Sequence, residues 1–182
     1  MTKKTAKVQD LIDMKFLETR KVFLNGQVDG KSAKHLIDRL IYLDLESHEP
    51  IQLFINSPGG YVTDGFAIYD TIKSLKSPVH TICSGLAASM GSILLSVGEK
   101  GHRYIQPHAK VMIHQPLGGA QGQASNIEIQ AKEILKTKEL SAKILAENCG
   151  QSFDKVMKDF SRDYWMDAQE SIDYGIVDQV MN

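Results

Sequence analysis

Residues 79–97 read VHTICSGLAASMGSILLSV, and this stretch decides the fold class of the chain. Its first part, Val79 to Cys83, is a β-type run, and its last part, Ile93 to Val97, is an apolar run that we expect to form a buried helix. The residues between them, Ser84 to Ser92, are small and turn-like. A strand, a sharp turn and a helix in this order predict an α/β fold with a nucleophilic side chain displayed at the turn.

The rest of the chain repeats this alternation of short strands and helices, without an internal repeat or a linker that would divide it. Strands are predicted at 22–24, 51–55, 110–113 and 176–180, and helices at 31–45, 66–75 and 125–148, with a short helix closed by Gly175. Two pairs have the spacing of helix-capping boxes, Ser125 with Glu128 and Asp167 with Glu170. We therefore predict one α/β domain.

Composition limits the functions open to the chain. Its 182 residues are 42% hydrophobic and 24% charged, which is ordinary for a soluble globular protein, and no stretch is apolar for long enough to cross a membrane. The net charge of -1 and the lack of a long basic run argue against nucleic acid as a partner. The two cysteines, Cys83 and Cys149, lie far apart, so we expect free thiols and a cytoplasmic location.

Ser89 is the best candidate for a nucleophile. It is flanked by small residues that allow a sharp turn, although Ala87 replaces the first glycine of the G-x-S-x-G pattern. A helix that begins just after the serine would point free N–H groups at a developing oxyanion, but a packed, non-catalytic helix start fits the same composition. Gly59-Gly60, in the breaker cluster 56–60, is either a second source of oxyanion donors or only a turn.

An activated serine also needs a base and an acid that orients the base. His114 is distinctive among the six histidines because it ends an apolar strand and precedes a loop, although other histidines near turns stay open. The chain has 22 acidic residues, and residue patterns alone do not choose Asp163 over Asp159, Asp167 or Asp173.

Four sequence blocks are more specific than these single residues. They are Ile55-Asn56-Ser57-Pro58-Gly59-Gly60, Gly85-Leu86-Ala87-Ala88-Ser89-Met90-Gly91-Ser92, Met112-Ile113-His114-Gln115-Pro116, and Arg162-Asp163 followed by Asp167-Ala168. Their order and spacing over roughly 22–180 resemble those of the Clp protease proteolytic subunit. The resemblance implies that Ser89 is the nucleophile, His114 the general base and Asp163 the orienting acid, and that the N–H groups of Gly60 and Met90 form the oxyanion hole.

The resemblance also implies an architecture. The expected fold is the crotonase/Clp-protease-like spiral of ββα units with a protruding strand-helix handle. On this basis, the single peptidase domain 1–182 divides into an N-terminal segment (1–21), a head (22–116 and 151–182) and a handle (117–150). The uncharged, glycine-rich run at the start of the handle is expected to be an exposed edge strand suited to pairing with another chain.

The activity that the resemblance implies is that of a serine endopeptidase in a self-compartmentalised protease, which cleaves unfolded polypeptides to short peptides. The expected assembly is a homo-oligomeric tetradecamer of two stacked heptameric rings. A hexameric AAA+ Clp ATPase is expected to deliver substrates, and a paralogous peptidase subunit is a further candidate partner. No cofactor is expected, because the chain has no G-x-x-x-x-G-K-[ST] motif and any ATP would be used by the partner unfoldase.

Two features depart from the family pattern. Ser161 stands where family members often have an acidic residue that joins ring-to-ring ion pairs, and the segment before Val22 is only loosely similar to the family's pore loops. Two other functions stay open, an acyl-CoA enzyme of the crotonase type and a structural subunit of a mixed ring. Neither would need a complete Ser/His/Asp set.

Overall fold

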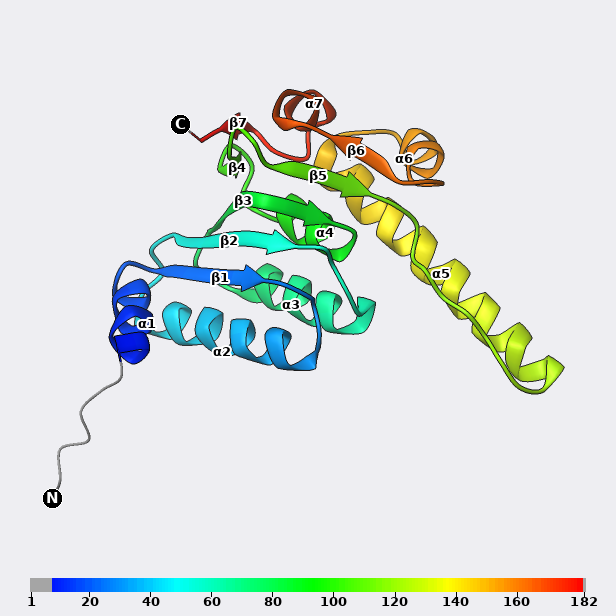
Figure 1. Ribbon diagram of the computed structural model, residues 1–182, viewed down its shortest axis with the longest axis horizontal. Helices are drawn as coiled ribbons and strands as arrows, with labels where there is room; N and C mark the ends of the chain where they lie inside the picture. The colour runs from blue at the N-terminus through cyan, green and yellow to red at the C-terminus, as the bar shows by residue number, and fades with distance from the viewer. Residues whose placement is uncertain (1–7, 182) are drawn as a thin grey trace, which may run out of the picture.

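The structure is a computed structural model that describes residues 8–181, and it contains a seven-stranded sheet with helices packed on it (Figure 1). In chain order the elements are α1 (Val8–Glu18), β1 (Lys21–Asn25), α2 (Gly30–Glu46), β2 (Ile51–Ser57), α3 (Val62–Ser74), β3 (Val79–Ala88), α4 (Met90–Ser96), β4 (Arg103–Ile105), β5 (Lys110–Ile113), α5 (Ala124–Cys149), α6 (Phe153–Asp159), β6 (Tyr164–Met166), α7 (Ala168–Tyr174) and β7 (Gln179–Val180). The predicted α/β class is confirmed.

Strand β3 organises the sheet because it pairs in parallel with three other strands, β2, β4 and β5. Its first part, Thr81 to Cys83, lies beside β4, and its last part, Leu86 to Ala88, lies beside β5. The change of partner coincides with a register shift against β2, where Gly85 has a φ of 101°. The strand β6 then adds to β5 in the antiparallel direction. As a result, β3 and β5 end side by side.

Helices α2, α3 and α4 pack against the sheet and enclose the main core (Figure 1). Helix α2 contributes apolar residues at helical spacing, such as Leu36 and Leu40, and alternate residues of β2, such as Leu53 and Ile55, meet them. Burying each of these side chains contributes about 1.5–3 kcal/mol. Every residue of the short helix α4 is buried, so the packing of α4 in the core fixes the turn that precedes it. Within 8–181, no helix is both long and apolar enough to span a bilayer.

Some local predictions were wrong. Residues 84–88 were expected in a turn, but they continue β3 because β5 gives them a pairing partner. The N-cap of α5 is Gln123, without a side-chain hydrogen bond, so the predicted capping box of Ser125 and Glu128 does not form. The last strand is shorter than predicted and contains only Gln179–Val180. By contrast, the capping box of Asp167 and Glu170 at α7 is confirmed.

The glycine-rich run at 117–123 precedes α5 in the chain and runs alongside it as an irregular segment (Figure 1). Gly118 packs against Ile134 of α5. A ladder needs a second strand, and the described chain places none beside this run. Its pairing with another chain therefore stays a prediction. Elements α1, β4, α6 and β6 were not predicted, and β4 and β6 have only three residues each, too few to show a periodicity.

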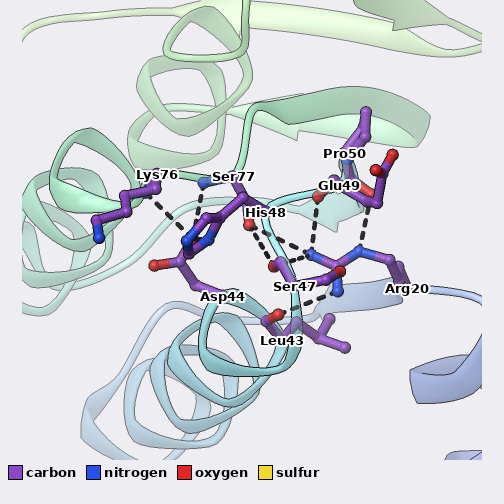
Figure 2. Close-up of polar contacts among 9 residues, drawn as sticks. All are labelled: Arg20, Leu43, Asp44, Ser47, His48, Glu49, Pro50, Lys76 and Ser77. Atoms are coloured by element: carbon purple, nitrogen blue, oxygen red, sulfur yellow. Dashed lines mark hydrogen bonds and ion pairs between the residues drawn. The ribbon is translucent and has the colours of Figure 1, made fainter.

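A single arginine ties the start of the sheet to the end of α2 (Figure 2). The Arg20 guanidinium donates hydrogen bonds to the carbonyl oxygens of Leu43, Ser47, Glu49 and Pro50 and to the Ser77 hydroxyl, at 2.7–3.2 Å. The last carbonyls of a helix and the turn after it have no intrahelical donors, and the planar fork of arginine supplies several donors at once. Arg20 therefore fixes the connection between α2 and β2.

Replacing Arg20 with lysine tests this role. An ammonium group cannot reach the same set of acceptors, so we expect the free energy of unfolding to fall by about 1–3 kcal/mol in urea denaturation. The matched control is Arg39→Lys, because within residues 8–181 the Arg39 guanidinium has polar contacts only with His35 and Asp13, at the helix surface. This variant should lose under about 0.5 kcal/mol of the free energy of unfolding. Equal stability of the two variants would show that the Arg20 contacts do not stabilise the fold.

Candidate active site

Ser89 occupies the turn between β3 and α4 in a conformation that is rare for a residue with a side chain. Its φ of 54° and ψ of -123° are the kind of backbone strain that costs on the order of 1–3 kcal/mol and is found at functional sites. The turn is held on both sides: the Ser89 N–H donates to the Met112 carbonyl at 2.9 Å, and the Ser89 carbonyl accepts from the Ser92 N–H and hydroxyl at 3.0 and 2.6 Å. This geometry displays the hydroxyl at the end of the strand.

The predicted base and acid lie in line with that hydroxyl. The His114 Nε2 lies 2.9 Å from the Ser89 Oγ, and its Nδ1 lies 3.2 Å from the Asp163 Oδ1. With its proton on Nδ1, His114 donates to the carboxylate and accepts from the serine hydroxyl. The imidazole is mostly buried, with 14% of its side chain exposed, whereas the Asp163 side chain is 60% exposed. The three predicted residues therefore form one continuous hydrogen-bonded chain.

Strand pairing explains why these residues meet although they are distant in sequence. Ala88 pairs with Met112 across β3 and β5, so Ser89 and His114 follow two strands that end together. On the other side of β5, Ile113 pairs with Tyr164 in the antiparallel direction, so His114 lies next to Asp163. A hydrogen bond from the Gln115 N–H to the Phe160 carbonyl, at 2.7 Å, continues this contact.

The other acids and histidines have different partners. Asp159 pairs with Lys155, Asp167 caps α7, and Asp173 accepts from Gln169 within α7. Of the four acids that residue patterns left open, Asp163 is the one for which the described chain shows a contact with the His114 imidazole. His35 and His48 contact residues of α2, and His80 and His102 stack on each other. His108 lies in the loop between β4 and β5.

The loop after β2 is packed directly against the Ser89 turn. A Cβ at Gly59 would lie 2.7 Å from the Ser89 Cβ and 2.8 Å from the Met90 nitrogen, and Gly59 also has a φ of 88°. Gly60 forms a parallel bridge with Val28: the Val28 N–H donates to the Gly59 carbonyl, and the Tyr61 N–H donates to the Val28 carbonyl. In this pattern the N–H of Gly60 itself points away from Val28. Within the described chain, neither the Gly60 nor the Met90 N–H donates a hydrogen bond. The geometry thus leaves two free donors near the serine.

A pocket of about 470 Å³ opens beside the imidazole, lined by His114, Gln115, Leu117, Ser161, Arg162 and Asp163. A larger one of about 730 Å³ lies among α1, β1 and α2, but in it His35 is hydrogen-bonded to Arg39, and the Ser32 hydroxyl donates to the backbone carbonyls of Gln27 and Asp29. Pocket size therefore does not locate the chemistry in this molecule.

The two thiols are poor alternatives to Ser89 as a nucleophile. Cys83 and Cys149 are free, as predicted, and buried. Burial raises the pKa of each thiol to about 12, so neither forms a thiolate at neutral pH.

Comparison with known protein families gives an independent result. A family model described as Clp protease matches residues 3–182, which is essentially the whole chain. The match includes all four sequence blocks and agrees with the mixed α/β fold. The family is one of peptidases. A match of this extent favours it over the acyl-CoA enzymes of the crotonase type that were considered from the sequence. The chain therefore belongs to the Clp protease family.

Proposed function

We propose that the chain is a serine endopeptidase subunit that cleaves unfolded polypeptides to short peptides through an acyl-enzyme. The observation that carries this proposal is the hydrogen-bonded chain from the Ser89 hydroxyl through His114 to Asp163. Its distances lie within or near the range over which a base removes a proton from a nucleophile. Membership of a peptidase family supplies the reaction class.

In the proposed mechanism, the Ser89 Oγ attacks the carbonyl carbon of the scissile peptide while the His114 Nε2 accepts the hydroxyl proton. Asp163 accepts from the Nδ1–H and stabilises the imidazolium that forms. The tetrahedral intermediate collapses when His114 donates that proton to the leaving amine, which releases the first product. A water molecule, deprotonated by His114, then hydrolyses the acyl-enzyme and regenerates Ser89.

The oxyanion of each tetrahedral intermediate is assigned to the N–H groups of Gly60 and Met90. Neither group donates to an acceptor among residues 8–181, and the contact of Gly59 with Ser89 and Met90 holds the two backbone segments together. Preorganised donors of this kind contribute about 2.7–4 kcal/mol each to lowering the barrier. None of these steps requires a metal or a cofactor.

The proposal extends to an assembly of two stacked heptameric rings that receives substrates from a hexameric AAA+ ATPase, the component that would use ATP. Helix α5 projects beyond the sheet, and apolar side chains including Ile129, Leu135 and Leu140 are exposed on it (Figure 1). Exposed apolar residues on a protruding element favour association with another chain. This observation supports the handle as the contact between rings. A cytoplasmic location and a paralogous ring partner complete the proposal.

Replacing Ser89 with alanine tests the nucleophile. We expect peptide cleavage to fall by on the order of 10⁶-fold, as in other triads, with unchanged assembly because little packing volume is lost. A fluorescent peptide assay and labelling by a fluorophosphonate probe measure the change. Ser84→Ala, on the strand that precedes Ser89, is the control and should retain both activity and labelling. Cleavage by Ser89→Ala at the parent rate would refute the assignment.

Replacing Asp163 with asparagine tests the orienting acid. The amide favours the wrong imidazole tautomer, so turnover should fall by roughly 10⁴-fold while the fold is retained. The matched control is Asp167→Asn, because asparagine caps a helix nearly as well as aspartate. Steady-state kinetics of both variants decide the matter. Equal losses of turnover would remove the distinction between the two acids.

Replacing Gly59 with alanine tests the packing of the oxyanion loop. The new Cβ would meet Ser89 and Met90 at 2.7–2.8 Å, so the loop must move, and both turnover and stability should fall, the latter by about 1–3 kcal/mol. The control is Gly119→Ala, since a Cβ there meets no atom within 4 Å. Parent turnover in Gly59→Ala would mean that the position of this loop does not affect catalysis.

A further inference from the structure

A second cluster of reactive side chains lies at the other end of β3. His80, Glu99 and His102 each offer one potential ligand atom, and these atoms all lie within 4.8 Å of one another. His80 follows the first residue of β3 and His102 directly precedes β4, so the cluster is at the start of these strands, whereas Ser89 follows the end of β3. The proposed peptidase mechanism uses none of the three residues.

The backbone brings the two imidazoles together. Thr81 pairs with Arg103 in parallel register, which makes His80 and His102 neighbours on the same face of the sheet. Their rings are stacked, with centroids 4.2 Å apart and planes within 5° of parallel. A pair of adjacent histidines with both side chains on one face is therefore a consequence of strand register, not of a chance rotamer.

The carboxylate is also placed by the backbone. The Glu99 N–H donates to the Val79 carbonyl, and the His102 N–H donates to the Glu99 carbonyl, both at 2.9 Å. These two bonds hold the turn between α4 and β4 against β3. As a result, the Glu99 Oε2 lies 3.4 Å from the His80 Nε2. All three side chains thus come from positions that are fixed relative to one another.

The polar surroundings suit a cation. The His102 Nδ1 lies 3.3 Å from the Tyr104 hydroxyl, a contact that leaves Nε2 available and resembles the outer-shell hydrogen bonds that orient metal-binding histidines. Arg103, the residue after His102, forms an ion pair with Asp178 at 2.6 Å.

We propose that His80, Glu99 and His102 bind one divalent transition-metal ion of the zinc type. Two imidazole nitrogens and one carboxylate oxygen are a common ligand set for Zn²⁺, with the fourth position left to water. A rotation of the imidazole rings out of their stack would direct their nitrogens to a common ion. Bound zinc would cross-link β3 to the turn before β4, away from the proposed catalytic residues.

Titration calorimetry of the metal-free protein with Zn²⁺ tests this site. We expect one tight equivalent per chain, and we expect His102→Gln and Glu99→Gln each to weaken it by more than about 100-fold, since loss of an outer-shell partner alone costs 10–100-fold. The matched control is His108→Gln, in the next loop, which should bind as the parent does. His114 is intact in all these proteins, so any binding of zinc at that residue is common to them and cancels in the comparison.

Two results would overturn the proposal: no tight equivalent in the parent protein, or the same tight equivalent in His102→Gln and His108→Gln. Peptide cleavage by the metal-free protein provides a separate readout. It should be equal in the parent, His102→Gln and His108→Gln, because the site is remote from Ser89. The zinc result therefore does not depend on whether the proposed peptidase mechanism is correct.

Discussion

The pairing of the last residues of β3 with β5 is the contact on which the candidate site depends. It sets Ala88 opposite Met112, and the hydrogen bond from the Ser89 N–H to the Met112 carbonyl continues it into the turn. Because β5 also pairs with β6, one strand places the histidine between the serine and the aspartate. A register shift of one residue between β3 and β5 would separate Ser89 from His114, and a shift between β5 and β6 would separate His114 from Asp163.

The strained turn at Ser89 is stable because it is surrounded by packed backbone. Helix α4 is buried along its whole length, Gly59 touches the turn from the loop after β2, and a Cβ at Gly91 would lie 3.0 Å from the Ser57 carbonyl oxygen. Such close approach of backbone to backbone is possible only with small residues. The small residues around Ser89 thus allow close packing of the backbone and also allow the sharp turn that displays the hydroxyl. For this reason composition alone did not distinguish a nucleophile turn from a packed helix start.

The sequence predicted much of the first half of the fold, because α2, β2 and α3 have clear periodic patterns and β1 is a short apolar run before Asn25-Gly26. It also singled out Ser89 and His114, since each lies where a strand ends. Asp163 could not be chosen from residue patterns, because its position depends on the antiparallel pairing of β5 with β6, a strand of three residues. Only the family resemblance pointed to it. The extension of β3 through 84–88 was missed for a similar reason, since these small residues are strand only beside β5.

The burial of both thiols affects how the protein responds to its chemical surroundings. Cys83 lies in the interior of β3, and Cys149 ends α5 in the core. Oxidants and alkylating reagents attack exposed thiolates, and neither sulfur is exposed or ionised in the folded chain. Burial and the raised thiol pKa values therefore disfavour reaction of either cysteine with peroxide or maleimide, and they protect β3, the strand that precedes Ser89, from modification at Cys83.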